Sequence, residues 1–202
     1  MIRACPGTRG DGAIGAARRA TRWRQWNLPL LLMIAGFLVA CGSAPVGETA
    51  IQAPNVVVIS ANLVTSGQPT AEALTGLSAQ GFGAVIYLAP PTVADAVAGE
   101  ADIVRKQGLE FVNISIRFDN PTDADFQSFV AAMNRLRDRK VLVHCQVNMR
   151  ASSLTFLYRV IVGGEKPETA YESVARIWSP GGPWKRLLVD QLRQAGIAFE
   201  PY

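Results

Sequence analysis

Apolar and polar positions follow two periods along the chain, and these periods predict strands that alternate with helices. Short apolar runs bounded by turn residues predict strands, because a strand covered on both faces is apolar throughout. Such runs occupy residues 56–60, 63–66, 84–88, 111–116 and 141–143. Apolar residues at helical spacing predict helices between and after them. We expect helices over 70–80, 93–107, 123–138, 150–163, 167–178 and 184–194.

The order of these elements predicts an α/β domain in three layers, with a mostly parallel central sheet flanked by helices. Parallel strands are buried on both faces, which fits the apolar runs over 84–88 and 141–143. Ligands of such sheets bind beside the carboxyl ends of the strands. Polar residues that directly follow a strand are therefore the first candidates for a functional site.

The first 41 residues differ from the rest of the chain. They contain six arginines and one aspartate, and an apolar run over 28–39 follows four of these arginines. This run has the length of a signal-peptide core and is shorter than the roughly 20 residues of a membrane span. The residues that end it, Leu38-Val39-Ala40-Cys41, resemble the bacterial lipoprotein signal, in which the cysteine is acylated.

This resemblance implies that Cys41 carries a lipid and anchors the protein to the bacterial cell envelope. Gly42, in place of an aspartate, favours the outer membrane, facing the periplasm. The alternatives are an uncleaved N-terminal anchor and a cleaved secretory signal without lipid. Three segments follow: a signal peptide over 1–41, a flexible tether over 42–54 that is rich in Gly, Ala and Pro, and a folded domain over 55–202.

The charge balance limits the partners of the folded domain. The whole chain has a net charge of +4, but residues 42–202 hold 14 basic and 15 acidic side chains. The excess of positive charge therefore belongs to the signal peptide. A domain without a basic surface lacks what nucleic acids need, so we expect no nucleic-acid partner.

One stretch, residues 141–153, concentrates the reactive side chains. It reads Val-Leu-Val-His-Cys-Gln-Val-Asn-Met-Arg-Ala-Ser-Ser and holds the only histidine of the chain, His144. A thiol between a strand end and a helix N-terminus lies near free backbone N–H groups, which favour a thiolate or a bound oxyanion. Cys145 has this position, and Arg150 adds a planar guanidinium that suits a phosphate group.

Cys145 is the one cysteine left to the folded domain. Cys5 lies in the signal peptide and Cys41 is the lipidation candidate, so Cys145 has no disulfide partner. A buried core cysteine is the simpler alternative. Its place between His144 and a polar loop favours a reactive role.

The run Val143-His144-Cys145, a short loop and Arg150 resembles the signature of cysteine-based phosphatases of the tyrosine and dual-specificity class. Three earlier segments, 66–69, 81–82 and 85–88, resemble bacterial phosphatase-like domains, including the one fused to β-lactamase-like hydrolases. The resemblance covers most of 55–195. It implies a cysteine-phosphatase-like fold and a phosphorylated protein or small molecule as substrate, with no cofactor.

The resemblance also assigns roles to the residues of this stretch. Cys145 would attack phosphorus to form a cysteinyl-phosphate, Arg150 would hold the phosphoryl oxygens, and His144 would support the thiolate through local hydrogen bonds. The substrate-binding residues would be Gln146, Val147, Asn148, Met149 and Ser152.

Asp119 is our candidate for the acid that protonates the leaving group. It follows a predicted strand, and no local structural role is evident for it. Thr122 and Asp125 fit a capping box, so Asp123 and Asp125 are assigned to a helix start instead. An ordinary turn aspartate is the alternative interpretation of Asp119.

The loop between Cys145 and Arg150 has four residues, one fewer than most cysteine phosphatases have. It lacks glycine, but Asn148 can adopt the positive φ that such a loop requires. Rhodanese-like sulfurtransferases also have four residues here, so transfer of sulfur through a Cys145 persulfide is a second hypothesis. A non-catalytic phosphate-binding envelope module is a third. One histidine and scattered carboxylates do not form a metal site, so we expect no metal.

Overall fold

The computed structural model describes residues 51–202, so the signal peptide, Cys41 and most of the tether lie outside the described residues. The strands are β1 (Val57–Ser60), β2 (Leu63–Ser66), β3 (Ala84–Tyr87), β4 (Glu110–Asn113) and β5 (Val141–His144). The helices are α1 (Ala71–Thr75), α2 (Glu100–Arg105), α3 (Asp123–Arg135), α4 (Met149–Ile161), α5 (Pro167–Ala175) and α6 (Gly182–Gln194), with a 3-10 turn, η1 (Ser78–Gln80).

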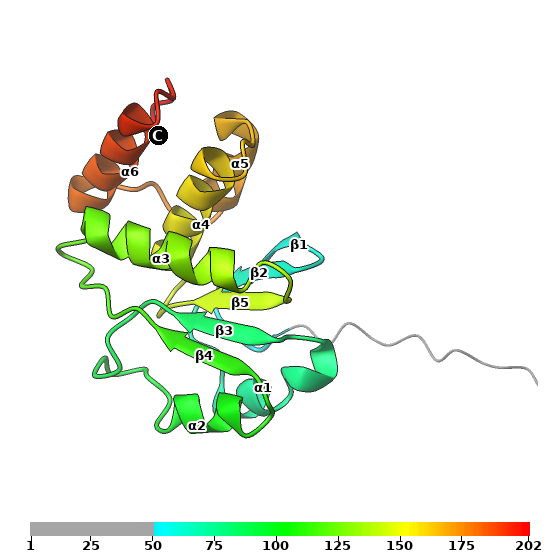
Figure 1. Ribbon diagram of the computed structural model, residues 1–202. Helices are drawn as coiled ribbons and strands as arrows, with labels where there is room; N and C mark the ends of the chain where they lie inside the picture. The colour runs from blue at the N-terminus through cyan, green and yellow to red at the C-terminus, as the bar shows by residue number, and fades with distance from the viewer. Residues whose placement is uncertain (1–50) are drawn as a thin grey trace, which may run out of the picture. The chain divides into compact units, whose positions relative to one another are not determined.

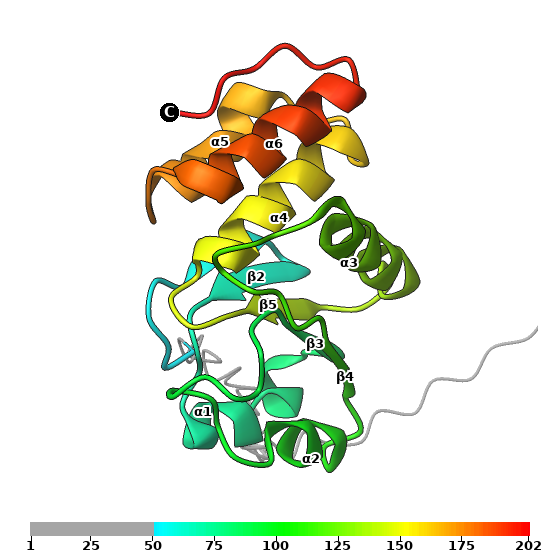
Figure 2. The ribbon, with the colours of Figure 1, turned by 90° about the vertical axis from the view of Figure 1, so that its left-hand side faces the viewer.

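The five strands form one sheet in the order β1-β2-β5-β3-β4. Strands β2, β5, β3 and β4 are parallel, and β1 pairs antiparallel with β2 at the edge. Helices α1 and α2 cover one face of the sheet, while α3 and α4 cover the other and α5 and α6 pack beyond α4 (Figures 1 and 2). This arrangement confirms the predicted three-layer α/β fold with a mostly parallel sheet.

Strand β5 occupies the centre of the sheet and all four of its residues are buried. Its side chains alternate between the two layers, as strand geometry requires. Leu142 belongs to the apolar cluster on the α1–α2 side, whereas Val141 and Val143 belong to the larger cluster on the other side. Cys145 also belongs to the larger cluster, so β5 ends with a histidine and a cysteine directed at different layers.

The helix predicted over 93–107 is wrong over its first half. Only α2 is helical, and residues 89–99 form turns and irregular structure before it. Gly99 has a φ of 70°, in the left-handed region, and a right-handed helix does not continue through such a residue. The helix therefore begins at Glu100, which places that carboxylate at a helix start and not within a helix.

Several other elements are also shorter than predicted, such as α3, which ends at Arg135, and α5, which ends at Ala175. The helix over 70–80 is divided into α1 and the 3-10 turn η1, and Gly81 follows it with a left-handed conformation. The strand over 111–116 ends at Asn113, whose side-chain amide donates to the carbonyl oxygens of Tyr87 and Ala89. These bonds add to the backbone bonds from Ile114 to Tyr87 and from Ile116 to Leu88, which lead the chain beyond β4 toward the site.

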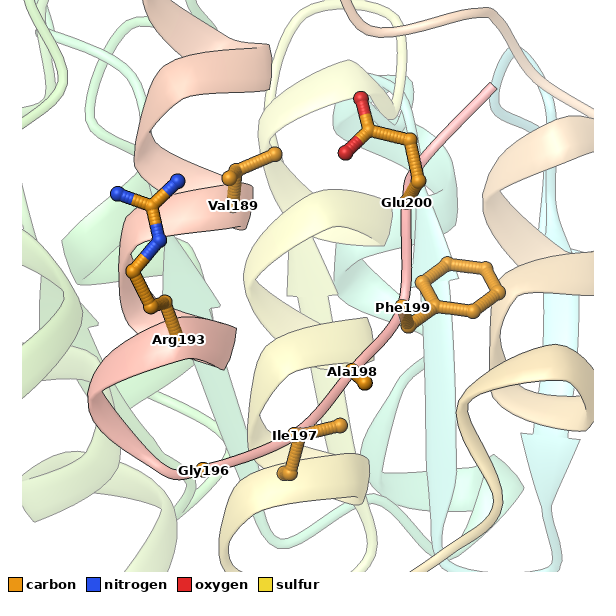
Figure 3. A pocket seen from close by; sticks show the side chains of 7 residues that line it. All are labelled: Val189, Arg193, Gly196, Ile197, Ala198, Phe199 and Glu200. Carbon is orange, nitrogen blue, oxygen red and sulfur yellow. The ribbon is translucent and has the colours of Figure 1, made fainter.

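Within residues 51–202 no helix has the length and apolar character needed to cross a membrane. A surface hollow of about 580 Å³ lies between α6 and the C-terminal segment over 196–200 (Figure 3). A second hollow, of about 340 Å³, is lined by residues of the segment 91–101 together with Tyr87, Phe111 and Asn113. No residue from Cys145 to Arg150 lines either of them.

Candidate active site

The Cys145 loop, residues 145–148, connects the carboxyl end of β5 to the first turn of α4. The Cys145 amide donates to the Ser66 carbonyl oxygen at 3.3 Å, and the Gln68 amide donates to the Gln146 carbonyl oxygen at 2.9 Å. Gly67 pairs with Val147 in an isolated bridge. The end of β2 therefore fixes the backbone of the loop, and the thiol of Cys145 is fully buried beneath it.

Gly67 permits this close approach. A Cβ atom on Gly67 would lie 2.7 Å from the Gln146 carbonyl oxygen and 2.9 Å from the Pro54 side chain. Both distances are too short for a real Cβ atom, and the first neighbour is backbone. The sequence Ser66-Gly67-Gln68-Pro69, which carries part of the family resemblance, thus supports the Cys145 loop directly.

Asn148 has a φ of 70°, which confirms the positive φ predicted for the loop. Its side chain is fully buried and donates to the Asn55 carbonyl oxygen at 2.6 Å and to Thr65 Oγ1 at 3.1 Å. Its own carbonyl oxygen accepts from the Ser152 amide at 2.9 Å. An asparagine therefore makes the turn into α4 and is held there from both sides.

The loop and the first turn of α4 present backbone donors. Within residues 51–202, no hydrogen-bond acceptor is present for the amide N–H groups of Gln146, Val147, Met149, Arg150 and Ala151. Free amides at the start of a 13-residue helix form a natural site for an anion, because the N–H groups and the helix dipole favour negative charge.

Arg150 is the second residue of α4 and only 4% of it is exposed. Its Nε donates to the Ile116 carbonyl oxygen at 3.1 Å, and its guanidinium lies 5.1 Å from the centre of the Phe118 ring. Its Nη1 is 3.4 Å from Gln146 Oε1. No carboxylate of residues 51–202 pairs with Arg150, so a buried positive charge faces the loop without a counter-ion from the described chain.

Asp119 lies on the segment that Arg150 contacts through Ile116 and Phe118. Its carboxylate accepts two hydrogen bonds from Arg117, at 3.1 and 2.7 Å, and 69% of its side chain is exposed. The hydrogen bonds from Arg117 hold the pKa of Asp119 below its usual value. The structure thus brings this segment to the site and gives Asp119 an ion-pair partner that the sequence analysis did not identify.

The remaining predicted substrate contacts lie around the loop. Gln146 Nε2 donates to Asp95 Oδ1 at 2.8 Å, which ties the loop to the segment after β3. Val147 is 41% exposed at the surface of the loop. Ser152 is buried, and its hydroxyl donates to the Met149 carbonyl oxygen at 3.2 Å.

The capping box predicted from Thr122 and Asp125 is present at the start of α3.

His144 is fully buried on the α2 side of the sheet. Its Nε2 lies 2.6 Å from Glu100 Oε1, within the distance of an ion pair if the imidazole is protonated, and the two atoms do not meet in hydrogen-bond geometry. The imidazole stacks on Tyr87 at 4.7 Å between ring centres. The sequence analysis missed Glu100, because the helix predicted over 93–107 placed this residue in the middle of a helix. Gly99, directly before it, is the signal that a helix begins at Glu100.

Comparisons with known proteins agree with this geometry. The model of a protein family described as "DSP-PTPase phosphatase fused to NAD+ Kinase" matches residues 45–181. A DUF442 protein from Shewanella putrefaciens CN-32 has 27% sequence identity with a TM-score of 0.66, and the match covers 71% of this chain and 94% of that one. No curated protein matches the chain.

Two solved phosphatase structures share the fold at lower identity. PTPMT1 has 19% identity and a TM-score of 0.59, and the match covers 70% of this chain and 96% of that one. Tk-PTP in its active form has 20% identity and a TM-score of 0.56, with the same coverage of both chains. These two likenesses extend only to the fold, and both agree with the three layers described above.

Proposed function

Since the chain belongs to the family of dual-specificity-type phosphatases described as fused to NAD+ kinase, we propose that it hydrolyses phosphomonoesters through a cysteinyl-phosphate on Cys145. One observation carries the proposal. The buried guanidinium of Arg150 lacks a carboxylate partner among residues 51–202 and lies beside a loop with free amides. A buried charge is costly unless it is paired, so a bound phosphoryl group would supply the missing negative charge.

The reaction would proceed in two displacement steps at phosphorus. In the first, the Cys145 thiolate forms a bond from Sγ to phosphorus while the bond from phosphorus to the leaving oxygen breaks, and an acid gives that oxygen a proton. In the second, water attacks phosphorus, loses a proton to the same carboxylate, and displaces Sγ to release inorganic phosphate. Arg150 and the loop amides would stabilise the negative charge on the phosphoryl oxygens throughout.

We assign the acid role to Asp119. The segment that carries it is attached to Arg150 through the Ile116 carbonyl oxygen and the Phe118 ring. Arg117 favours the ionised form of Asp119, so the acid role requires that this ion pair opens when substrate binds. Both side chains are exposed, and an exposed ion pair of this kind is weak enough to open at little cost.

Sulfur transfer is not favoured as an alternative. The loop length alone left it open, but the family match and the fold place the chain among cysteine-based phosphatases. Sulfur transfer would also need no protonation of a leaving oxygen, and therefore no acid such as Asp119. A non-catalytic phosphate-binding module remains as the competing outcome of the experiment below.

The experiment compares the full-length chain in detergent with its Cys145→Ser variant on an aryl phosphate. We expect a burst of aryl alcohol, phosphate on the Cys145 peptide after an acid quench, and loss of both in the variant. The variant keeps inorganic phosphate binding, because Arg150 and the amides are intact. Equal turnover by both proteins would end the covalent mechanism. Phosphate binding without turnover in the wild type would identify a binding module.

We also propose that Cys41 is lipidated and that the domain faces the periplasm. The support is the sequence Leu38-Val39-Ala40-Cys41 after an apolar run of signal-peptide length. Expression in a Gram-negative host, followed by mass spectrometry of the mature N-terminal peptide, tests this assignment. We expect a lipid-modified Cys41 in the membrane fraction, unchanged by Cys5→Ala and lost in Cys41→Ala. An unmodified N-terminus at another residue would contradict it.

A further inference from the structure

A second polar cluster lies on the opposite side of β5 from the thiol, and the proposed reaction does not account for it. We call His144, Glu100, Gln68 and Tyr87 the α2-side cluster. All four are almost fully buried, with exposed fractions of 0%, 5%, 8% and 2%. His144 ends β5 and Glu100 begins α2. Gln68 follows β2, and Tyr87 ends β3. A buried polar group is expensive to retain without a purpose or a full set of partners.

Glu100 is the centre of this cluster. Its Oε1 lies 2.6 Å from His144 Nε2, and its Oε2 accepts from Gln68 Nε2 at 2.9 Å. No lysine or arginine of residues 51–202 pairs with it. Among described residues, His144 is therefore the only group that can bring a positive charge to this buried carboxylate.

The carboxylate constrains the imidazole. An ionised carboxylate only accepts hydrogens, so the 2.6 Å approach of Glu100 Oε1 favours a hydrogen on Nε2, although the two atoms do not meet in hydrogen-bond geometry. When His144 is also protonated at Nδ1, the two side chains form a buried ion pair. That state places a positive charge on the residue directly before Cys145, where it favours the thiolate.

Glu100 also reaches the Cys145 loop through a second route. Gln68, which donates to Glu100 through its side chain, donates through its backbone amide to the Gln146 carbonyl oxygen at 2.9 Å. One carboxylate therefore contacts both the histidine before the nucleophile and the residue that supports the loop after it. Tyr87 covers one face of the imidazole, because its ring stacks on that of His144 with an angle of 15° between the ring planes.

We propose that Glu100 is a positioning residue for the nucleophile, which acts through His144 on the reactivity of Cys145 and through Gln68 on the shape of its loop. Glu100 does not contact the reacting phosphoryl group, so it is not a catalytic residue. Glu100 is the first residue of α2, whereas Cys145 belongs to the apolar cluster on the other side of the sheet. The inference rests on the proposed function for the role of Cys145 as nucleophile, but the alkylation experiment below does not require turnover.

The ionisable groups that contact the imidazole are Glu100 of α2, at Nε2, and Tyr87 of β3, which stacks on the ring. The charged groups that act on Tyr87 extend this set to Asp95 of the segment after β3, Arg150 of α4 and Cys145. Only Glu100 contacts an imidazole nitrogen. A pH profile that changes when Glu100 alone is altered therefore reports on this contact.

The experiment measures alkylation of Cys145 against pH, read by mass spectrometry of its peptide, in the full-length chain. Wild type is compared with Glu100→Gln, Glu100→Asp and Gln68→Leu. The matched control is Asp102→Asn, an exposed carboxylate on the same helix. We expect Glu100→Gln to slow alkylation at pH 6 about tenfold, within the coupling range of residues in one network, and to move the half-maximal pH upward. Glu100→Asp restores part of the rate, and Asp102→Asn leaves the profile unchanged.

A double-mutant cycle with His144→Asn separates a positioning role from a merely structural one. If Glu100 acts through His144, Glu100→Gln has little further effect on alkylation when His144 is already replaced. Additive effects would overturn the proposal, and so would an unchanged alkylation profile in Glu100→Gln, whatever its melting temperature. If Glu100→Gln does not fold, the Glu100→Asp and Gln68→Leu variants take its place. Slower alkylation in these variants supports the proposal, and alkylation profiles equal to that of wild type overturn it. Absence of turnover in the wild type would reject the proposed function but leave the alkylation result intact.

Discussion

Asn55 and Asn148 are the two non-glycine residues with positive φ in the described chain, at 51° and 70°. The side chain of each donates a hydrogen bond to the backbone of the other's segment. The Asn148 side chain donates to the Asn55 carbonyl oxygen at 2.6 Å, and the Asn55 side chain donates to the Val147 carbonyl oxygen at 3.0 Å. Asparagine enters the left-handed region at lower cost than other residues with a Cβ atom. The segment before β1 thus braces the turn that leads into α4.

Replacing Asn148 is expected to separate backbone strain from lost hydrogen bonds. Asn148→Gly keeps the conformation but loses the side-chain bonds, which costs about 1–3 kcal/mol of unfolding free energy for the two bonds. Asn148→Ala loses the same bonds and adds a left-handed penalty of about 1–2 kcal/mol, which exceeds the entropy cost of glycine. Urea unfolding should rank wild type above the glycine variant and the glycine variant above the alanine variant. The exposed Asn120→Ala serves as control, and the reverse order of the two Asn148 variants would contradict the strain argument.

Arg150→Lys is expected to abolish tight oxyanion binding. Lysine carries the charge but cannot donate both to the Ile116 carbonyl oxygen and in a bidentate manner to a phosphoryl group. We expect kcat/KM on an aryl phosphate to fall about 10²–10³-fold, as for loss of one oxyanion donor, and vanadate inhibition to weaken in parallel. The exposed Arg137→Lys is the matched control. Unchanged vanadate affinity in Arg150→Lys would show that the anion binds elsewhere.

The loop of the site could be predicted from sequence, because its requirements are local. The loop begins with a thiol at the end of a strand and ends with an arginine at the start of the next helix. Because this short loop lacks glycine, Asn148 is the residue expected to have a positive φ. The partners of this loop could not be predicted in the same way. Asn55 and Glu100 reach it from segments distant in sequence. Gly99 indicates a helix start at Glu100, but no local pattern shows which residues Asn55 or Glu100 will contact.

Asp119→Asn tests the acid role through the leaving group. A poor leaving oxygen needs a proton in the transition state, and general acid catalysis contributes about 10²–10⁴-fold. We therefore expect a large loss of kcat/KM, which reports the first displacement, on alkyl phosphates and a small loss of kcat/KM on aryl phosphates with an acidic leaving group. Asp138→Asn, an exposed aspartate in a comparable pair with Arg137, is the control. Equal losses on both substrate types would assign the acid to another residue.

Arg117→Ala is expected to move the alkaline limb of the pH profile. The hydrogen bonds from Arg117 lower the pKa of Asp119, so their removal lets Asp119 keep its proton to higher pH. Because the acid must be protonated to act in the first displacement, kcat/KM should decline at a higher pH in the variant than in wild type. The shift should shrink in concentrated salt, since both groups are exposed. A shift toward lower pH would contradict the assignment.

Tyr87 is expected to make the fold sensitive to alkali. Burial, aided by the charge of Glu100, raises the pKa of Tyr87 from 10.0 to about 12. The unfolded chain therefore ionises this phenol first as the pH rises. The stabilisation is complete below pH 10 and is lost as the pH passes through about 12. Urea midpoints should fall more steeply above pH 10 in wild type than in Tyr87→Phe, and the exposed Tyr202→Phe should behave as wild type. Parallel midpoints in wild type and Tyr87→Phe would contradict this role.

The alternation of side chains along β5 places two polar groups on opposite layers, and Gln68 joins them. Its backbone amide donates to the Cys145 loop and its side chain donates to Glu100. Under the proposed function, the positions that shape substrate selectivity and those that tune the thiol are therefore coupled through one residue. A redesign of this protein for a new phosphoester would have to change Gln68 and its two neighbours together.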